Sequence, residues 1–270
     1  MKNIKILLAL LAIVSLSIAC TTDDNSGSGS GSSSKARVVS KIIFEGDDEV
    51  EEYAFKYDSD GRITRVTYTA DDGDYYVKYY YNYGSDNELE IVKESGGDAY
   101  GGGYSNTTYV LLNNKGYMTL VDNLMTLSYD SKGYLVSASE SEEDWLCEIS
   151  YLWSGGNIVE MEYMSEEEGD SFSYTATFDY NNKPMSMVNL DLNLVLSGWI
   201  GPLYVPYSWG DGLTGRKSKN FMTGLTYESS DDYEEEATIS WSYDEDGYPK
   251  EALVEYDNGY EFCMTIKYKN

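Results

Sequence analysis

Residues 145–153 read Trp145-Leu146-Cys147-Glu148-Ile149-Ser150-Tyr151-Leu152-Trp153, and the two kinds of side chain in this stretch alternate. The odd-numbered positions hold aromatic or apolar side chains, whereas the even-numbered positions include Glu148 and Ser150. A period of two places successive side chains on opposite faces of an extended strand. The stretch therefore predicts an antiparallel β-strand that packs one face on a core and turns the other to water.

The same alternation returns in two more stretches. They are Phe172, Tyr174, Ala176, Phe178 and Tyr180, and later Tyr260, Phe262, Met264, Ile266 and Tyr268. No segment has a convincing long helical period. The chain has 28 Tyr and only 6 Phe, so most aromatic rings have a hydroxyl that needs a partner or water. These patterns predict an all-β, many-stranded antiparallel meander that forms a curved sheet or a soluble barrel.

A Tyr-Asp-x-x-Gly motif separates several of the predicted strands. It occurs as Tyr57-Asp58-Ser59-Asp60-Gly61, as Tyr129-Asp130-Ser131-Lys132-Gly133 and as Tyr243-Asp244-Glu245-Asp246-Gly247, with weaker copies ending at Gly116 and Pro184. Asp can accept hydrogen bonds from its own downstream backbone, and Gly accepts the positive φ that closes a short turn. Asp58 and Asp60, or Asp71, Asp72 and Asp74, could also be imagined as calcium ligands, but a hairpin turn explains them more simply.

The N-terminus has the features of an export signal followed by a tether. Residues 1–19 contain Lys2 and Lys5, an apolar core and small residues before Cys20, which predicts a removable signal peptide. Leu16-Ser17-Ile18-Ala19-Cys20 resembles a bacterial lipoprotein signal, although Ser17 stands where that signal usually has Leu. The resemblance implies a lipid on Cys20 that holds the protein to the membrane; the alternative is an ordinary cleavage site. Residues 20–34 then predict a flexible Gly/Ser tether, and residues 35–270 a single antiparallel β domain.

Charge and composition exclude several classes of function. The formal net charge is −28, with 47 acidic and 19 basic residues, which argues against nucleic-acid binding. The chain has no histidine, so Ser-His-Asp and Cys-His catalysis and histidine-ligated metals are excluded. We therefore predict no catalytic residue, no metal site and no cofactor. Cys147 and Cys263 could form a disulfide or remain free thiols, and their spacing does not decide between these.

The segment near 185–222 interrupts the hairpin rhythm. Leu190, Leu192, Leu194 and Leu196 alternate with polar residues, and an aromatic stretch with two prolines follows. Its large aromatics could line a ligand site, and the candidates are Trp199, Tyr204, Tyr207 and Trp209. The alternative is that the segment folds inward and plugs the barrel, because a wide interior must be filled.

Two resemblances extend this interpretation. The Tyr-Asp-x-x-Gly hairpins resemble the YD repeats of the RHS family of bacterial surface proteins. The whole chain resembles gut-bacterial lipoproteins of unknown function with a porin-like β fold, through Asp191-Leu192-Asn193 and Lys217-Ser218-Lys219-Asn220. Here Phe221-Met222 follows where that family has Leu-Pro. The resemblance implies a curved antiparallel sheet closing toward a barrel, and no enzymatic activity.

The resulting hypothesis is a non-catalytic lipoprotein of the cell envelope, anchored to the outer membrane, that binds a glycan or another envelope protein through barrel loops. Asp23 and Asp24 resemble signals that direct such proteins to the cell surface, but they could be ordinary tether residues, so the membrane face stays open. Outward residues such as Ser173, Thr175 and Glu261 argue against a membrane-spanning barrel. The alternatives are a carboxylate-based glycoside hydrolase and a purely structural envelope protein.

Overall fold

Alternating side chains build an antiparallel barrel in the computed structural model of this chain. The structure describes residues 36–46, 50–70, 75–97, 103–143, 145–200 and 212–269, with the backbone alone for residues 198–200. The strands within these ranges are β1 (Val39–Glu45), β2 (Val50–Tyr57), β3 (Ile63–Ala70), β4 (Tyr75–Tyr83), β5 (Glu88–Gly96), β6 (Tyr104–Leu112), β7 (Met118–Val121), β8 (Met125–Tyr129), β9 (Leu135–Glu142), β10 (Trp145–Ser154), β11 (Asn157–Glu167), β12 (Asp170–Pro184), β13 (Asn220–Ser229), β14 (Glu234–Tyr243), β15 (Pro249–Tyr256) and β16 (Glu261–Tyr268).

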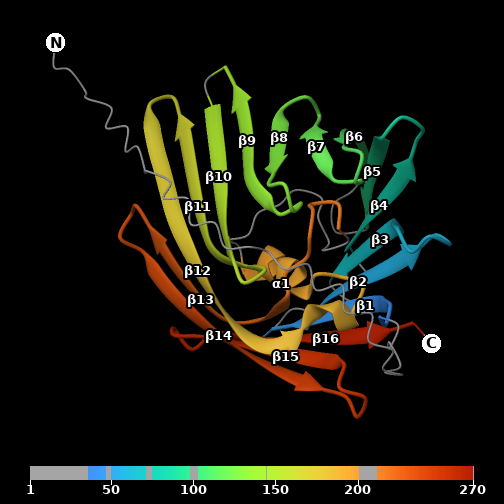
Figure 1. Cartoon of the computed structure of the whole chain (residues 1–270), viewed down its shortest axis with the longest axis vertical. Coiled ribbons are helices and arrows are strands. Elements are labelled where there is room, and N and C mark those ends of the chain that lie inside the picture. Colours follow the sequence, from blue (N-terminus) through green and yellow to red (C-terminus); the bar gives the residue numbers. More distant parts are fainter. Residues whose placement is uncertain are drawn as a thin grey trace, which may run out of the picture. The chain divides into compact units, whose positions relative to one another are not determined.

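Each described strand pairs with its neighbours in sequence, and β1 also pairs antiparallel with β16. The 16 strands of the described chain therefore form a closed barrel, which confirms the predicted all-β, antiparallel architecture. Figure 1 shows these strands as a ring around the short helix α1 (Leu192–Ile200). All the strands lie between residues 39 and 268, within the compact unit Lys35–Asn270, so the barrel is complete without residues 1–34.

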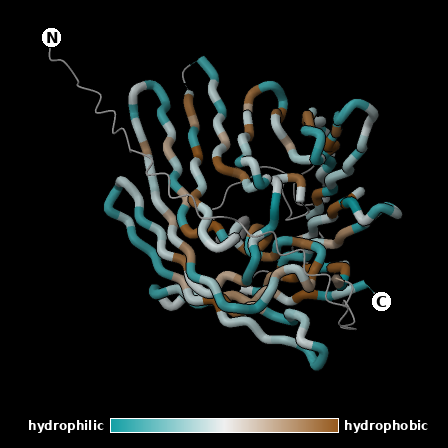
Figure 2. The backbone as a smooth tube through the Cα atoms, viewed as in Figure 1, coloured by the Kyte–Doolittle hydropathy of each residue, from teal (hydrophilic) through white to brown (hydrophobic). Residues whose placement is uncertain are grey.

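The predicted alternation sets which face of each strand lies inside. In β10, Cys147, Ile149 and Tyr151 are buried, whereas Glu148 and Ser150 are exposed. The opposite face of β12 is likewise polar, with Ser173, Thr177 and Asp179 exposed. Brown and teal segments alternate along the strands in Figure 2 as this pattern requires. Within the described chain, no helix has the length and apolar character needed to cross a membrane.

The hairpin motif behaves as its chemistry predicts. In the turn between β2 and β3, Oδ1 of Asp58 accepts hydrogen bonds from the backbone N–H groups of Asp60 and Arg62, both at 2.9 Å. Gly61 has a φ of 84°, a conformation that costs glycine little. Asp244 repeats the arrangement between β14 and β15. Asp58 therefore supports a turn, as the simpler interpretation held, while Asp71, Asp72 and Asp74 lie outside the described residues.

The turns of this motif gather at one end of the barrel, which we call the closed end. Six of the even-numbered strands have an aromatic residue near their end at the closed end. The side chains of these residues each donate a hydrogen bond to a backbone carbonyl at the start of the preceding strand. We call them the closed-end donors: Tyr57 to Val39 (2.8 Å), Tyr129 to Met118 (2.7 Å), and, each at 2.6 Å, Trp153 to Leu135, Tyr180 to Ile158, Trp241 to Met222 and Tyr268 to Pro249. The Asp and Gly of the motif thus form the turn. The aromatic residue at or near its first position adds a hydrogen bond to the neighbouring strand.

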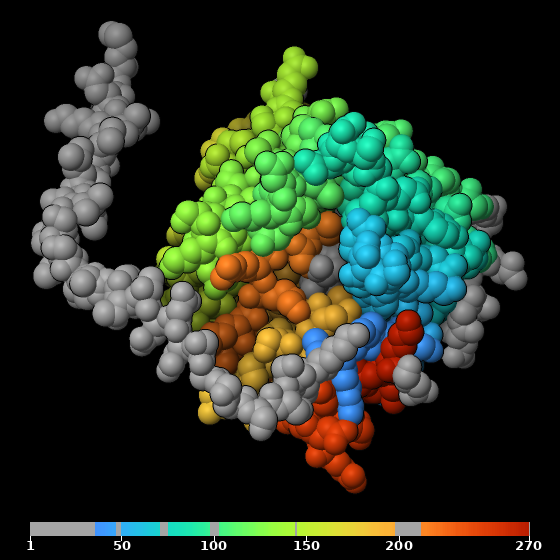
Figure 3. Space-filling model, turned by 45° about the vertical axis from the view of Figure 1, so that its right-hand side comes forward, coloured from blue at the N-terminus to red at the C-terminus, as the bar shows by residue number. Residues whose placement is uncertain are grey.

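The described part of the segment 185–222, residues 185–200 and 212–222, lies at the closed end, in agreement with the plug interpretation. It contains the 3₁₀ turn η3 (Met185–Met187) and α1, and its Met185, Leu192 and Leu196 belong to the buried core. In Figure 3, gold and orange atoms of this segment lie within the ring formed by the blue and green walls. Within the run of alternating leucines, α1 begins at Leu192. In this helix Leu192, Val195 and Leu196 are buried at a helical spacing, whereas Leu194 is only partly buried.

Buried polar side chains hold this plug together. Asp191 precedes α1, and its carboxylate accepts from the backbone N–H groups of Asn193 at 3.1 Å and Ser218 at 2.6 Å. The amide of Asn193 donates to the carbonyl of Asn220 at 2.8 Å and accepts from the N–H of Met222 at 2.9 Å. Burial raises the pKa of Asp191. The segments 191–193 and 217–220, singled out separately in the sequence, are therefore in direct contact.

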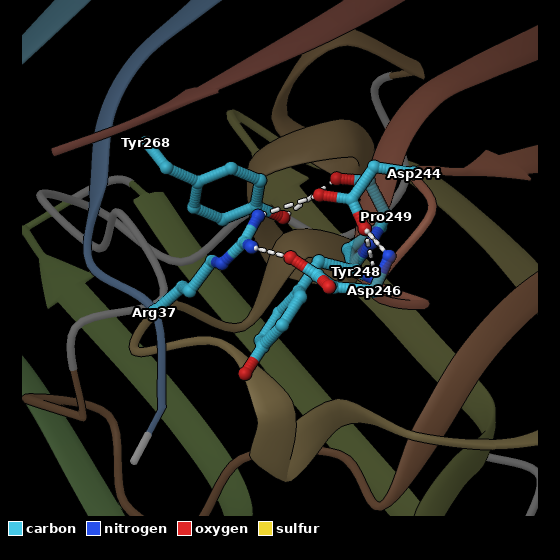
Figure 4. A network of polar contacts seen from close by, with 6 residues as sticks. All are labelled: Arg37, Asp244, Asp246, Tyr248, Pro249 and Tyr268. Carbon is cyan, nitrogen blue, oxygen red and sulfur yellow. Dashed lines mark hydrogen bonds and ion pairs between the residues drawn. The ribbon is translucent and has the colours of Figure 1, made fainter. Parts of the chain in front are cut away.

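The chain enters the barrel at the closed end through Arg37. Its guanidinium contacts Asp244 at 2.5 Å and also Asp246, and it lies 4.0 Å from the ring centroid of Tyr248 and 5.5 Å from that of Tyr268. Figure 4 shows this network, which joins the start of the barrel to the hairpin between β14 and β15. The N-terminal segment and the C-terminal strand thus meet beside the same turn.

The two cysteines of the barrel are free thiols. Cys147 is buried on the inner face of β10, whereas Cys263 is on the outer face of β16, opposite Glu45 of β1. Strands β10 and β16 are not neighbours, so the disulfide considered as an alternative does not form.

Candidate functional site

The ligand-site residues predicted from sequence cannot be assembled into a site. Tyr204, Tyr207 and Trp209 lie outside the described residues, as does Cys20. Trp199 lies within α1, where only its backbone is described. A candidate site therefore has to be sought among the strands.

The end of the barrel opposite the turns of Asp58 and Asp244 has inward-facing aromatic residues above the apolar core. We call this end the mouth, and its rings the aromatic arc: Tyr75, Tyr68, Tyr53, Phe44, Phe262, Tyr256, Tyr227, Tyr174 and Tyr163. Each of them is two residues from a core residue of the same strand, as Tyr174 is from Ala176. The arc follows the wall from β4 through β1 and β16 to β11, and most of its tyrosines are half-buried.

Ring-to-ring contacts make the arc nearly continuous. On one side, the ring centroids of Tyr53 and Tyr68 are 5.1 Å apart, and Phe44 lies 5.7 Å from Tyr53. Phe44 then contacts Phe262 of β16 at 6.1 Å, so the arc crosses the junction where the barrel closes. Because aromatic pairs at these separations hold one another in place, the arc is a preorganised surface.

The other side of the arc is more tightly stacked. Tyr163 and Tyr174 lie nearly parallel, at 13° and 4.7 Å, and Tyr174 is 4.9 Å from Tyr227. Burial raises the pKa of Tyr174, so its phenol stays neutral at physiological pH.

Two carboxylates are set into the arc. Glu51 accepts hydrogen bonds from the hydroxyls of Tyr68 at 2.8 Å and Tyr53 at 3.1 Å. Glu235 is half-buried on β14, opposite Tyr227, and accepts from the hydroxyl of Tyr233 at 3.0 Å. This hydrogen bond raises the pKa of Tyr233. The carboxylates thus place hydrogen-bond acceptors between aromatic faces.

The facing wall, from β5 to β10, is polar. Lys93, Asn106 and Glu140 face inward there, together with Cys147 beside Glu140 and with Tyr104 and Trp145 nearer the strand ends. Burial together with Glu142 raises the pKa of Glu140. Strands β7 and β8 have 4 and 5 residues, the shortest of the described strands, so the wall is lowest there. The mouth is therefore asymmetric, with an aromatic side and a polar side.

The comparisons concern this architecture. The chain matches the crystal structure of a porin-like protein from Bacteroides uniformis with a TM-score of 0.57 and 18% identity, over 87% of this chain and 100% of that one. A porin-like protein from Bacteroides vulgatus matches with a TM-score of 0.54 and 12% identity, over 86% and 99%. The barrel has a porin-like fold. No protein-family model and no curated protein matches the sequence.

The porin-like fold fits the resemblance noted in the sequence, and at these identities the comparison concerns the fold alone. The aromatic arc was missed because each of its tyrosines looks like any other inward residue of an alternating strand. A signal was present, however: Tyr and Phe take the inward positions near the charged hairpins in several strands, as Phe172 and Tyr174 do after Asp170 and Tyr256 does before Asp257. Aromatic faces with interspersed acceptors can stack on a sugar ring and bind its hydroxyls.

Proposed function

We propose that this protein is a non-catalytic lipoprotein of the bacterial cell envelope that binds a glycan in the mouth of its barrel. The observation that carries the proposal is the aromatic arc with Glu51 and Glu235 set into it. Stacked, half-buried rings offer apolar contact at low entropic cost, and the carboxylates and phenols supply directional hydrogen bonds.

The place where the described chain begins supports an anchored arrangement. Arg37 lies at the closed end, so a tether at 20–34 with a lipid on Cys20 would be attached to the barrel at the end opposite the mouth. The polar outer face of strands such as β12 and β14 suits a barrel that stands in water rather than in lipid. An outer-membrane location follows from the same anchor.

The glycan site is tested with the chain from residue 21 onward, which contains the whole barrel. A glycan array identifies a bound sugar, and titration calorimetry then compares variants. We expect Tyr174→Ala to weaken binding about three- to tenfold, since one aromatic contact contributes about 0.5–1.5 kcal/mol. Tyr109→Ala, on the exposed outer face of β6, is the matched control and should bind as the wild type does. An empty array with folded protein would reject the site.

The hydrolase alternative has one observation in its favour. Glu140 faces the mouth, and burial raises the pKa of its carboxyl, as a general acid requires. If the bound glycan is cleaved, Glu140→Gln should abolish turnover while the exposed Glu166→Gln leaves it unchanged. If a glycan binds but is not cleaved, the result supports the binding function and rejects the hydrolase.

A further inference from the structure

We infer that the ligand of the mouth carries a cationic amino group, which binds between the tyrosines around Glu235. The inference rests on the proposed glycan-binding function and narrows it to amine-bearing sugars. It depends on two features of the mouth, one local and one electrostatic.

The local feature is a half-buried carboxylate that lies beside aromatic rings. Glu235 lies opposite Tyr227 and accepts from the Tyr233 hydroxyl at 3.0 Å and, more weakly, from the Asn258 amide at 3.4 Å. No Lys or Arg of the described chain forms an ion pair with it. A half-buried carboxylate of this kind gains from a cation more than a surface carboxylate does, because it is less screened by water.

The rings around Glu235 have the geometry that receives a cation. The centroids of Tyr227 and Tyr233 are 6.0 Å apart with their planes at 66°, so the two rings form a corner instead of a closed stack. Tyr256 of β15 adds a third ring from the neighbouring strand, because it lies opposite Ala237, two residues from Glu235 along β14. An ammonium group at such a corner is attracted by the negative ring faces and by the carboxylate together.

The electrostatic feature is the charge of the hairpins that surround this corner. The three hairpins joining β11–β12, β13–β14 and β15–β16 expose acidic side chains and contain neither Lys nor Arg. Their acidic residues are Glu166, Glu167, Glu168, Asp170, Asp231, Asp232, Glu234, Glu236, Glu255, Asp257 and Glu261. Basic residues such as Lys183, Lys219 and Lys250 lie instead near the closed end. The rim therefore attracts cations toward the site before contact.

A neutral sugar would use the same rings but not this charge. Its hydroxyls can donate to Glu235, yet they gain nothing from the acidic rim. An acidic sugar would be repelled by Glu235 and by the acidic rim. The sugar that satisfies rings, carboxylate and rim together is one with a free amine.

The test compares two probes that differ only in this group. Glucosamine oligosaccharides and N-acetylglucosamine oligosaccharides of equal length are titrated into the chain from residue 21 onward at pH 6 and low ionic strength. We expect the free-amine series to bind at least tenfold more tightly, and this preference to fall with added salt.

Substitutions then assign the preference to the site. Glu235→Gln should remove it while near-ultraviolet circular dichroism stays unchanged, whereas Glu234→Gln, at the exposed neighbouring position, should keep it. Tyr227→Leu, a second variant, should weaken the amine series more than the acetylated series.

Three outcomes would overturn the inference. Equal binding of the two series, or a preference that survives Glu235→Gln, refutes the cationic site while glycan binding stands. Binding that prefers an acetylated or acidic sugar on the array does the same. An array without any bound glycan removes the proposed function and this inference together.

Discussion

At the scale of single residues, the plug depends on a few buried polar groups. Asn193 is 1% exposed and joins α1 to the start of β13 through two hydrogen bonds. Asn193→Ala would leave the carbonyl of Asn220 and the N–H of Met222 buried without these partners. We expect a loss of about 2–4 kcal/mol in unfolding free energy, measured by urea denaturation. Asn114→Ala, exposed in the β6–β7 hairpin, should change it by less than about 0.5 kcal/mol; equal effects would contradict the role of Asn193.

Asp58 makes one hairpin sensitive to acid. The backbone N–H of Arg62 and the Arg62 side chain lower the pKa of this carboxyl below its ordinary value of 3.8. Its ionised form therefore stabilises the fold above pH 3.8, and this contribution is lost as the pH falls through the lower folded pKa. Asp58→Asn keeps the acceptor oxygen but not the charge. The gap between the unfolding midpoints of wild type and variant should be largest near pH 6 and shrink toward pH 3, and a gap independent of pH would contradict this account.

The sequence predicted some of these residues and not others. The roles of Asp58 and Gly61 follow from local chemistry, because their partners are within four positions along the chain. The contact between Asn193 and Asn220 joins residues 27 positions apart, and no local pattern encodes it. Trp199, Tyr204, Tyr207 and Trp209 remain predictions, since the structure does not describe their side chains.

At the scale of elements, the closed-end donors link pairs of strands where the ladder ends. The hydroxyl of Tyr180 donates to the carbonyl of Ile158 at 2.6 Å in a buried setting. Tyr180→Phe should lower the unfolding free energy by about 1–2 kcal/mol, since it leaves this carbonyl without its donor. Thermal and urea unfolding would measure the loss. Tyr109→Phe, on an exposed ring of β6, should have no effect, and a Tyr180→Phe variant as stable as the wild type would refute the role of the hydroxyl.

Strands were easier to predict than the helix for a physical reason. In β10 and β12, polar residues alternate with aromatic or apolar residues from one position to the next, and an extended strand is the one structure that explains this pattern. Around α1, leucines at 190, 192, 194 and 196 fit a period of two, while Leu192, Val195 and Leu196 fit a helix. Asp191, whose carboxylate accepts the N–H of Asn193, is a residue type that often precedes a helix, so a local signal for α1 stood beside the competing alternation.

At the scale of the whole molecule, excess negative charge acts against the compact state. The formal net charge is −28, and it becomes two units more negative if Lys2 and Lys5 are removed. Repulsion of this kind is screened within about 8–10 Å at 0.1–0.15 M salt. We expect the thermal midpoint of the chain from residue 21 onward to rise as NaCl increases from about 10 to 150 mM. A midpoint that falls over this range would show that attractive ion pairs, such as those of Arg37, dominate instead.

The barrel was predicted as a class, but its closure was not. Every hairpin is a local event that turn chemistry encodes, whereas the β1–β16 pairing joins Lys41 to Lys267 across nearly the whole chain. The mouth is a product of that closure, because Phe44 and Phe262 meet only there. A site assembled from ten neighbouring strands cannot be read from any one of them.

The antiparallel junction of β1 with β16 also limits how such a protein can change its size during evolution. The first and last strands run in opposite directions, so a duplication or deletion of a single strand would make them parallel and remove the antiparallel ladder that closes this ring. The gain or loss of a whole hairpin would keep that ladder. The number of strands in related barrels is therefore expected to change in steps of two. A chain truncated before Glu261 would lack β16 and leave β1 and β15 as unpaired edge strands that are prone to aggregate.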